Sequence, residues 1–297
     1  MTSLPLANSR VGTTPVCFRD WFAQTPAQYT SGRDPARRMK LAEFPQFVAD
    51  ELGMPFTELW SVFFDDISPA YCASLAEAAA KAGVSIDNIQ LDAIDADLAS
   101  LDNERRDHSV EVVKQWMDRA ALIGAPSVRA NADQPTAGRP FDPDRIADSY
   151  RRLAEYGDRI GVDILVENHF GYTAQISNVM AIHERVAHPR FGLLADWGNS
   201  PAETTEARIA DLSHMFGDLR LVEAKAIRFD EDYNHLNYDI GAIVRATEAS
   251  GYTGKYAVEL FTLGDAMPLD PVRAIQSVAA TIRDNLRAAD ASAAIKE

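Results

Sequence analysis

Eight short apolar segments alternate along the chain with longer segments in which apolar residues recur every three or four positions. Short apolar runs are typical of buried strands, and the longer period is typical of helices that bury one face. The expected strands are Arg10–Thr14, Phe56–Val62, Ile86–Asp92, Ser127–Asn131, Asp163–His169, Phe191–Asp196, Leu219–Ala226 and Tyr256–Phe261. The expected helices lie near residues 41–52, 70–82, 104–123, 143–160, 176–187, 203–216, 239–250 and 271–288. This order indicates an α/β fold, a single (β/α)₈ TIM barrel, rather than an open doubly wound sheet.

The chain shows no internal boundary. No linker rich in Pro, Gly or Ser divides the 297 residues, and a barrel of this length is commonly one domain. The period of the last helix is clear, because apolar residues follow Pro271 at steps of three or four up to Leu286. We therefore predict one domain over residues 1–297, with the barrel at about 10–288 and a frayed tail at 289–297.

Composition excludes several classes of function. The formal net charge of −15 argues against nucleic acid and anionic membrane as partners, since both attract basic proteins. No apolar run is long enough to span a bilayer, and the first residues do not resemble a secretory signal. Cys17 and Cys72 follow no metal or redox spacing, so a cytoplasmic location is expected. No expected strand leads into a GxGxxG or GxxxxGK[ST] motif, which argues against nucleotide binding.

Four carboxylates lie at the ends of the last four expected strands. They are Glu167, Asp196, Glu223 and Glu259, which follow one another at 29, 27 and 36 residues, each about one strand–helix unit. The carboxyl ends of barrel strands face one pocket, where a single Glu would usually be solvated or ion-paired. Four acids in register would repel one another unless a cation or shared protons compensate them. We predict one divalent ion, Mg²⁺ or Mn²⁺, because all four ligands are oxygen donors.

Several motifs resemble those of the sugar phosphate isomerase/epimerase group of xylose isomerase-like barrels. The likeness runs from about Val11 to Leu286 and is strongest in VENHFG, LADWGN, EAKAIRFDED, GYTGKYAVELF and RRDHSVEVVKQWMDRAALIGAPSVRAN. The resemblance implies one divalent ion, often manganese, held by a Glu, an Asp, a His and a second Glu from strands five to eight. On this chain those positions are Glu167, Asp196, Glu223 and Glu259.

The third of these positions departs from the family pattern. The family commonly has His in an HxK motif, and this chain has Glu223-Ala224-Lys225. Three interpretations are open: a fully carboxylate site, a ligand from elsewhere such as His169, or a weakened metal site. We favour the first, because Glu is a competent oxygen ligand.

The resemblance also implies proton transfer next to a sugar carbonyl. A chelated hydroxy-carbonyl sugar has an acidified α-proton, and the ion stabilises the enediolate that forms. If Glu167 and Glu259 stand on opposite faces of the bound carbon, one would remove the proton and the other would return it. Lys225 would stabilise the developing oxyanion or merely neutralise the acidic cluster, and His169 would touch substrate hydroxyls or a ligand carboxylate.

A small-molecule sugar or polyol ketone is the expected substrate. The candidate substrate-binding residues are Trp60, Arg129, Asn168 and Asn199, which end or follow expected strands. The Arg-rich segment SGRDPARRMK is interpreted as solvated charge rather than a phosphate site, so phosphorylation of the substrate stays open.

Four other functions compete with an isomerase or epimerase. A dehydratase or lyase would use the same enolate to expel a β-leaving group from a keto-sugar or oxo-glycoside. An aldolase would form a Schiff base on Lys225, and an endonuclease is disfavoured by six His and the negative charge. A barrel whose metal site has decayed would bind a ligand without catalysis. A homo-oligomer is possible in each case.

Overall fold

The computed structural model describes residues 6–35, 37–133, 139–261 and 270–294. Eight parallel strands close into a barrel in chain order, and β8 returns to pair with β1. The strands are β1 (Val11–Thr13), β2 (Phe56–Trp60), β3 (Ser85–Leu91), β4 (Ser127–Ala130), β5 (Asp163–Glu167), β6 (Phe191–Asp196), β7 (Leu219–Ala226) and β8 (Lys255–Leu260). The predicted (β/α)₈ TIM barrel is confirmed.

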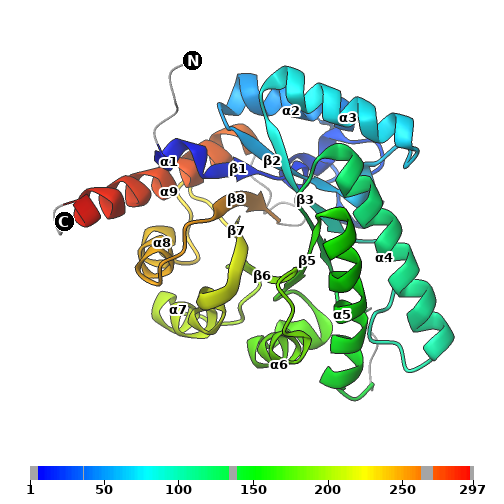
Figure 1. The fold of residues 1–297 in the computed structure, drawn as a ribbon. Coiled ribbons are helices and arrows are strands. Elements are labelled where there is room, and N and C mark those ends of the chain that lie inside the picture. Colours follow the sequence, from blue (N-terminus) through cyan, green and yellow to red (C-terminus); the bar gives the residue numbers. More distant parts are fainter. Residues whose placement is uncertain (1–5, 36, 134–138, 262–269, 295–297) are drawn as a thin grey trace.

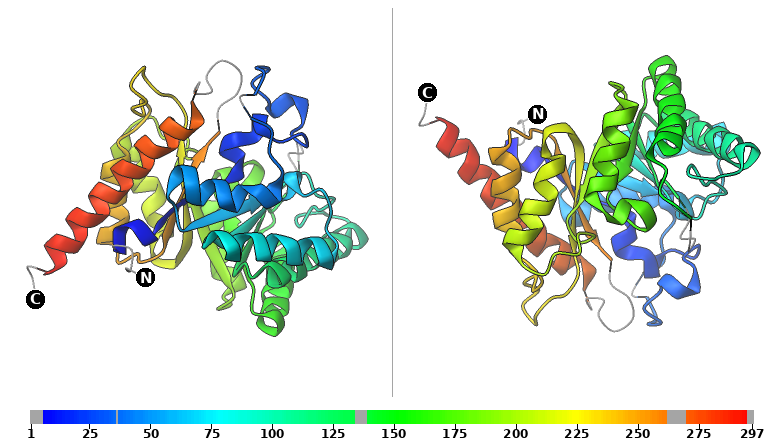
Figure 2. Two further views of the ribbon diagram at one scale, coloured as in Figure 1. Left: turned by 90° about the horizontal axis from the view of Figure 1, so that it is seen from above. Right: turned by 90° about the horizontal axis from the view of Figure 1, so that it is seen from below.

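Helices form an outer ring around the strands (Figure 1). They are α1 (Leu6–Ser9), α2 (Phe44–Phe47), α3 (Pro69–Ala82), α4 (Asn103–Ile123), α5 (Pro143–Ile160), α6 (Ile176–Val186), α7 (Thr205–Leu212), α8 (Ile240–Ala249) and α9 (Pro271–Ala294). The end of α9 projects beyond this ring in all the views of Figures 1 and 2. Within the described ranges, no helix combines the length and apolarity needed to cross a membrane.

Local sequence explains where the long helices begin and end. The side chain of Asp102 accepts a hydrogen bond from Glu104 N at the start of α4, and that of Asp142 accepts one from Arg145 N at the start of α5. Both helices stop at a glycine in the left-handed conformation, Gly124 with φ 87° and Gly161 with φ 76°. An acidic N-cap and a left-handed glycine satisfy backbone groups that a helix end leaves open.

Some predicted boundaries differ from the structure. The expected helix at 41–52 is divided into a 3-10 turn (Leu41–Glu43), α2 and a π-helical turn (Val48–Leu52). Pro45 has no N–H and is tolerated only in the first turn of α2. The tail predicted at 289–297 is wrong up to Ala294, because the Ala-rich end of α9 continues the helix, and 295–297 lie outside the described residues.

The barrel interior contains an apolar layer beneath an acidic one. Leu165, Leu194 and Leu221 form a cluster of their own, separate from the main core between sheet and helices. Side chains two positions apart share one face of a strand, so the next inward residues are Glu167, Asp196 and Glu223. The acidic layer therefore lies on the carboxyl side of the apolar floor.

Candidate active site

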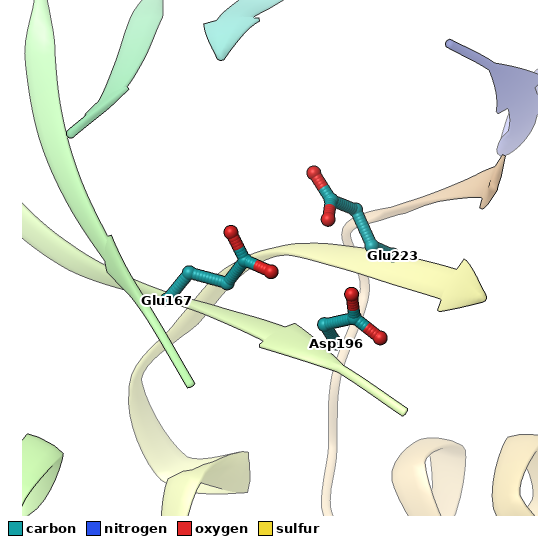
Figure 3. A group of neighbouring side chains, drawn as sticks. All are labelled: Glu167, Asp196 and Glu223. Atoms are coloured by element: carbon teal, nitrogen blue, oxygen red, sulfur yellow. The ribbon is translucent and has the colours of Figure 1, made fainter. Parts of the chain in front are cut away.

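Three of the four predicted carboxylates converge at the carboxyl ends of neighbouring strands. Oxygens of Glu167, Asp196 and Glu223 lie within 4.8 Å of one another. Figure 3 shows these side chains turned toward one another from β5, β6 and β7. All three are at most 1% exposed. Glu259 is not part of this group, and its role as a metal ligand stays a prediction.

Lys225 supplies positive charge beside this acidic triad, which is Glu167, Asp196 and Glu223. Its ammonium forms ion pairs with Asp196 and with Glu259 Oε1, the latter at 3.1 Å. Lys225 and Glu259 are register partners on β7 and β8, so strand pairing sets this contact. Burial opposes the charge, but Asp196 and Glu259 raise the pKa of Lys225 well above its ordinary value. The side chain is therefore an ammonium ion at neutral pH.

Arg129 is the second internal cation. Its Nε lies 2.9 Å from Glu167 Oε2, and its two terminal nitrogens donate to the carboxylate of Asp92 at 3.1 and 3.0 Å. Asp92 also accepts hydrogen bonds from Trp60 Nε1 and Asn131 Nδ2. Burial opposes ionisation of Asp92, but Arg129 lowers its pKa below the usual value. The guanidinium is thus paired with the carboxylates of Glu167 and Asp92.

A polar network on β2 and β3 extends the acidic layer. Gln90 Nε2 donates to Glu58 Oε2 at 3.3 Å and also to Glu223 Oε1, while Thr14 Oγ1 donates to Gln90 Oε1 at 3.1 Å. Asn88 Nδ2 donates to Glu58 Oε1 at 2.8 Å. Burial raises the pKa of Glu58 to about 8, so this carboxyl is protonated at neutral pH. Sequence interpretation missed Glu58, Gln90 and Asp92, although the same strand alternation places the first two inward.

The charges of the site favour an added cation. Burial, followed by the neighbouring acids, raises the pKa of Glu223 well above its usual value, and burial does the same for Glu167 against the opposing effect of Arg129. Glu223 Oε2 is buried and accepts no hydrogen bond from the described residues. Buried carboxylate oxygens that gather within 4.8 Å of one another suit a hard divalent ion. The acidic triad therefore fits a metal of this kind.

A cavity of about 510 Å³ lies next to the triad, because its lining includes Gln90, Arg129 and Lys225, which contact the triad carboxylates. Its polar lining includes Arg129, Asn131, His169, Lys225 and Glu259. Glu259 lines the cavity and is 4% exposed, whereas the triad members are at most 1% exposed and are not among its lining residues. The volume is within the range of pockets that bind small molecules.

His169 and Trp60 both line this cavity. Burial and the nearby Arg129 lower the pKa of His169 to about 3, so its ring is neutral. His169 Nδ1 is buried without a hydrogen-bond partner among the described residues and is free for a substrate group. Trp60 packs edge-on to Tyr29, with ring centroids 6.1 Å apart, and its Nε1 is held by Asp92. Both predicted residues therefore line the cavity, and their contact with a substrate stays a prediction.

The two predicted asparagines have different positions. Asn199 lines the cavity, donates to Glu167 Oε1 at 2.8 Å and accepts from Lys225 Nζ at 3.0 Å. Asn168 instead exchanges two hydrogen bonds of 2.8 Å with the backbone of Asp196. Since both ends of its amide are occupied, Asn168 fixes the ends of β5 and β6, and substrate binding by it stays a prediction.

The Arg-rich segment SGRDPARRMK, which precedes α2 in the chain, contributes no residue to the cavity lining in the described part of the chain. Arg37 pairs with Glu51 at 3.1 Å, and Arg38 Nη1 donates to the backbone of Asp20 at 3.4 Å. Neither is among the residues that line the cavity next to the triad. These contacts agree with the interpretation of this segment as surface charge.

A family model described as the xylose isomerase-like TIM barrel matches residues 47–285, which is most of the chain. The chain belongs to this family. Among curated proteins, no sequence matches it significantly.

Solved structures resemble this xylose isomerase-like barrel over nearly its whole length. An L-ribulose 3-epimerase has a TM-score of 0.75 at 18% identity, covering 97% of this chain and 98% of the other. The 3-keto-D-glucoside 4-epimerase YcjR from E. coli has a TM-score of 0.67 at 16% identity, covering 93% and 99%. A xylose isomerase-like barrel protein from Mycobacterium smegmatis in complex with magnesium has a TM-score of 0.68 at 16% identity, covering 96% and 100%. At these identities the likeness shows a shared fold.

Proposed function

We propose that this barrel is a divalent-metal-dependent epimerase or isomerase that moves an α-proton of a sugar or keto-sugar. The observation that carries the proposal is the buried acidic triad next to a cavity that also presents Lys225 and Glu259. Two similar structures are named as sugar epimerases and a third as a magnesium complex, which supports the same chemistry.

Glu167, Asp196 and Glu223 would hold the ion, with Glu259 as the proposed fourth ligand. Mg²⁺ and Mn²⁺ are the ions we propose, because every one of these donors is a carboxylate oxygen. A bound ion of this kind would polarise the substrate carbonyl and make the adjacent C–H more acidic. This assignment retains the fully carboxylate site expected from Glu223.

Each step of proton transfer is assigned to a side chain of the protein. Glu259 reaches the cavity and is the proposed base on one face of the reacting carbon, with Glu167 as the acid on the other. The Lys225 ammonium would stabilise negative charge on the substrate oxygen. Its raised pKa opposes the neutral amine that a Schiff-base aldolase needs. Neutral His169 would accept or donate one hydrogen bond to a substrate hydroxyl.

We further propose that the substrate carries no phosphate. In the described part of the chain, the cationic side chains of the cavity lining are Arg129 and Lys225, and both are neutralised by carboxylates. Apart from the proposed ion, a phosphate dianion would find no cation in the described lining that is not already paired with a carboxylate. A small uncharged sugar is the partner that this lining favours.

NMR in D₂O across a panel of ketoses and oxo-sugars tests the function. We expect deuterium to enter next to the carbonyl of one substrate in the presence of Mn²⁺, and Glu259→Gln to abolish the exchange. An eliminated fragment in place of a rearranged sugar would identify a lyase instead. Absence of exchange for every substrate, with metal bound, would reject proton transfer and favour a binding barrel.

A further inference from the structure

The cavity extends beyond the mouth of the barrel. Gln90 and Arg129 point inward, because they contact Glu223 and Glu167. Their strand neighbours Leu91 and Ala130 must then face outward, yet they line the same cavity. The cavity therefore passes over the ends of β3 and β4.

The outer part of the cavity lies between the sheet and α4. Val113 of α4 lines it together with Leu91, Ala96 and Ala130, and all four belong to the main core between sheet and helices. Helix α4 packs against both β3 and β4. We define the side branch by the lining residues Leu91, Ala93, Ile94, Ala96, Val113 and Ala130.

Small residues keep the side branch open. Three of its six lining residues are alanines at positions where larger side chains would otherwise fill the layer. The backbone turns at Ala93, whose φ of 54° is a value that residues other than glycine rarely adopt. The turn follows Asp92, whose N–H donates to Ser61 Oγ and whose carboxylate is held by Arg129. The branch is thus bounded by a fixed segment of backbone.

The six residues that define the side branch are all apolar, whereas the polar lining residues of the cavity lie outside it and include Arg129, His169, Asn199, Lys225 and Glu259. Asp92, the polar group at their junction, already accepts hydrogen bonds from Trp60, Arg129 and Asn131. A ligand that fills both parts must join a polar, hydroxyl-bearing end to an apolar end. We propose that the side branch binds an apolar, ring-sized substituent on an uncharged sugar, such as an aromatic aglycone. This proposal rests on the proposed sugar function.

Calorimetric titration of the metal-loaded protein tests the side branch without relying on catalysis. The probes are methyl β-D-glucopyranoside, phenyl β-D-glucopyranoside and benzyl alcohol. We expect the phenyl glycoside to bind about 10-fold tighter than the methyl glycoside, from burial of the ring. Ala130→Leu, or Ala96→Leu if the first variant does not fold, should abolish that difference and leave the methyl glycoside unaffected. Val128→Leu adds volume on the same face of β4 outside the lining and should retain it.

The probes separate this proposal from the proposed function. Binding of benzyl alcohol that Ala130→Leu abolishes would support the branch even if neither glycoside binds, and that result would count against a sugar substrate. Equal binding of the two glycosides by the wild-type protein would overturn the side branch and leave sugar binding in place. A preference for the phenyl glycoside that survives both alanine substitutions would also overturn it.

Discussion

Lys225 Nζ lies 3.1 Å from Glu259 Oε1 on the neighbouring strand and also pairs with Asp196 of the acidic triad. The β7–β8 register makes these two residues direct partners. The ammonium ion of Lys225 thus forms ion pairs with Glu259, which lines the cavity, and with Asp196 of the buried triad. The protein carries part of the positive charge that its acidic site requires.

Lys225→Met removes the buried ammonium and leaves the carboxylates of Asp196 and Glu259 without their ion-pair partner. Losing one partner of a buried ion pair costs about 3–5 kcal/mol, so urea unfolding in EDTA should show a loss of this size. Added Mn²⁺ should restore more stability to the variant than to the wild type. Lys255→Met is the matched control, because Lys255 is 36% exposed and pairs with Asp87 near the surface. Equal losses in the two variants would refute the role of Lys225.

Glu58→Gln tests the protonated carboxyl of the network on β2 and β3. Burial raises the pKa of Glu58 from 4.5 to about 8, so the folded protein binds a proton that the unfolded chain releases. The contribution of Glu58 to the free energy of unfolding is fully present below pH 4.5 and is lost as the pH rises through 8. The wild type in EDTA should lose on the order of 2–4 kcal/mol across this range.

The Gln variant should lack this part of the pH dependence of the unfolding free energy. Its amide keeps the size of the side chain but does not titrate. Glu77→Gln, at an exposed residue of α3, serves as the control and should follow the wild-type curve. A slope shared by all three proteins would contradict the assignment to Glu58.

Arg208→Met tests how the loop after β6 is held. Arg208 donates to the backbone oxygens of Trp197, Ser200 and Ala202, which flank Asn199. The variant leaves these carbonyls unsatisfied, and we expect a loss of about 2–4 kcal/mol together with weaker Mn²⁺ binding. Arg245→Met, at a 57% exposed side chain, should change neither quantity. If the variant is destabilised but binds Mn²⁺ with unchanged affinity, this loop does not support the metal site and that part of the prediction is wrong.

Gly12→Ala tests the close packing of β1 on β2. A methyl group at Gly12 would lie 2.4 Å from Phe56 O and 2.7 Å from two ring carbons. Because backbone must shift to make room, thermal unfolding should show a loss of about 2–3 kcal/mol. At Gly217 an added Cβ meets nothing within 4 Å, so Gly217→Ala should leave stability unchanged. Similar melting temperatures for the two variants would contradict this account of the packing.

The barrel was predictable because each strand–helix unit carries its own local signals. The bounds of β6, β7 and α5 agree with the prediction, and each has a clear apolar period or cap. Short turns were not predictable to the same degree. The segment after Lys40 becomes three different helical turns, since Pro45 and tertiary packing outweigh its simple helical period.

The acidic triad was predictable because its members end successive strands. The Gln90–Glu223 contact was not, because the two residues are 133 positions apart and only barrel closure brings them together. Glu58 stands within an aromatic strand and gives no strand-end signal. Asn168 resembled a substrate ligand in sequence, but its amide is satisfied by backbone groups of Asp196.

Anomalous X-ray scattering from crystals soaked in MnCl₂ tests the central claim most directly. The account predicts one manganese ion per chain, bound by oxygens of Glu167, Asp196 and Glu223, and no such ion in Asp196→Asn crystals. A structure with the three carboxylates in place and no manganese between them, at saturating MnCl₂, would contradict it.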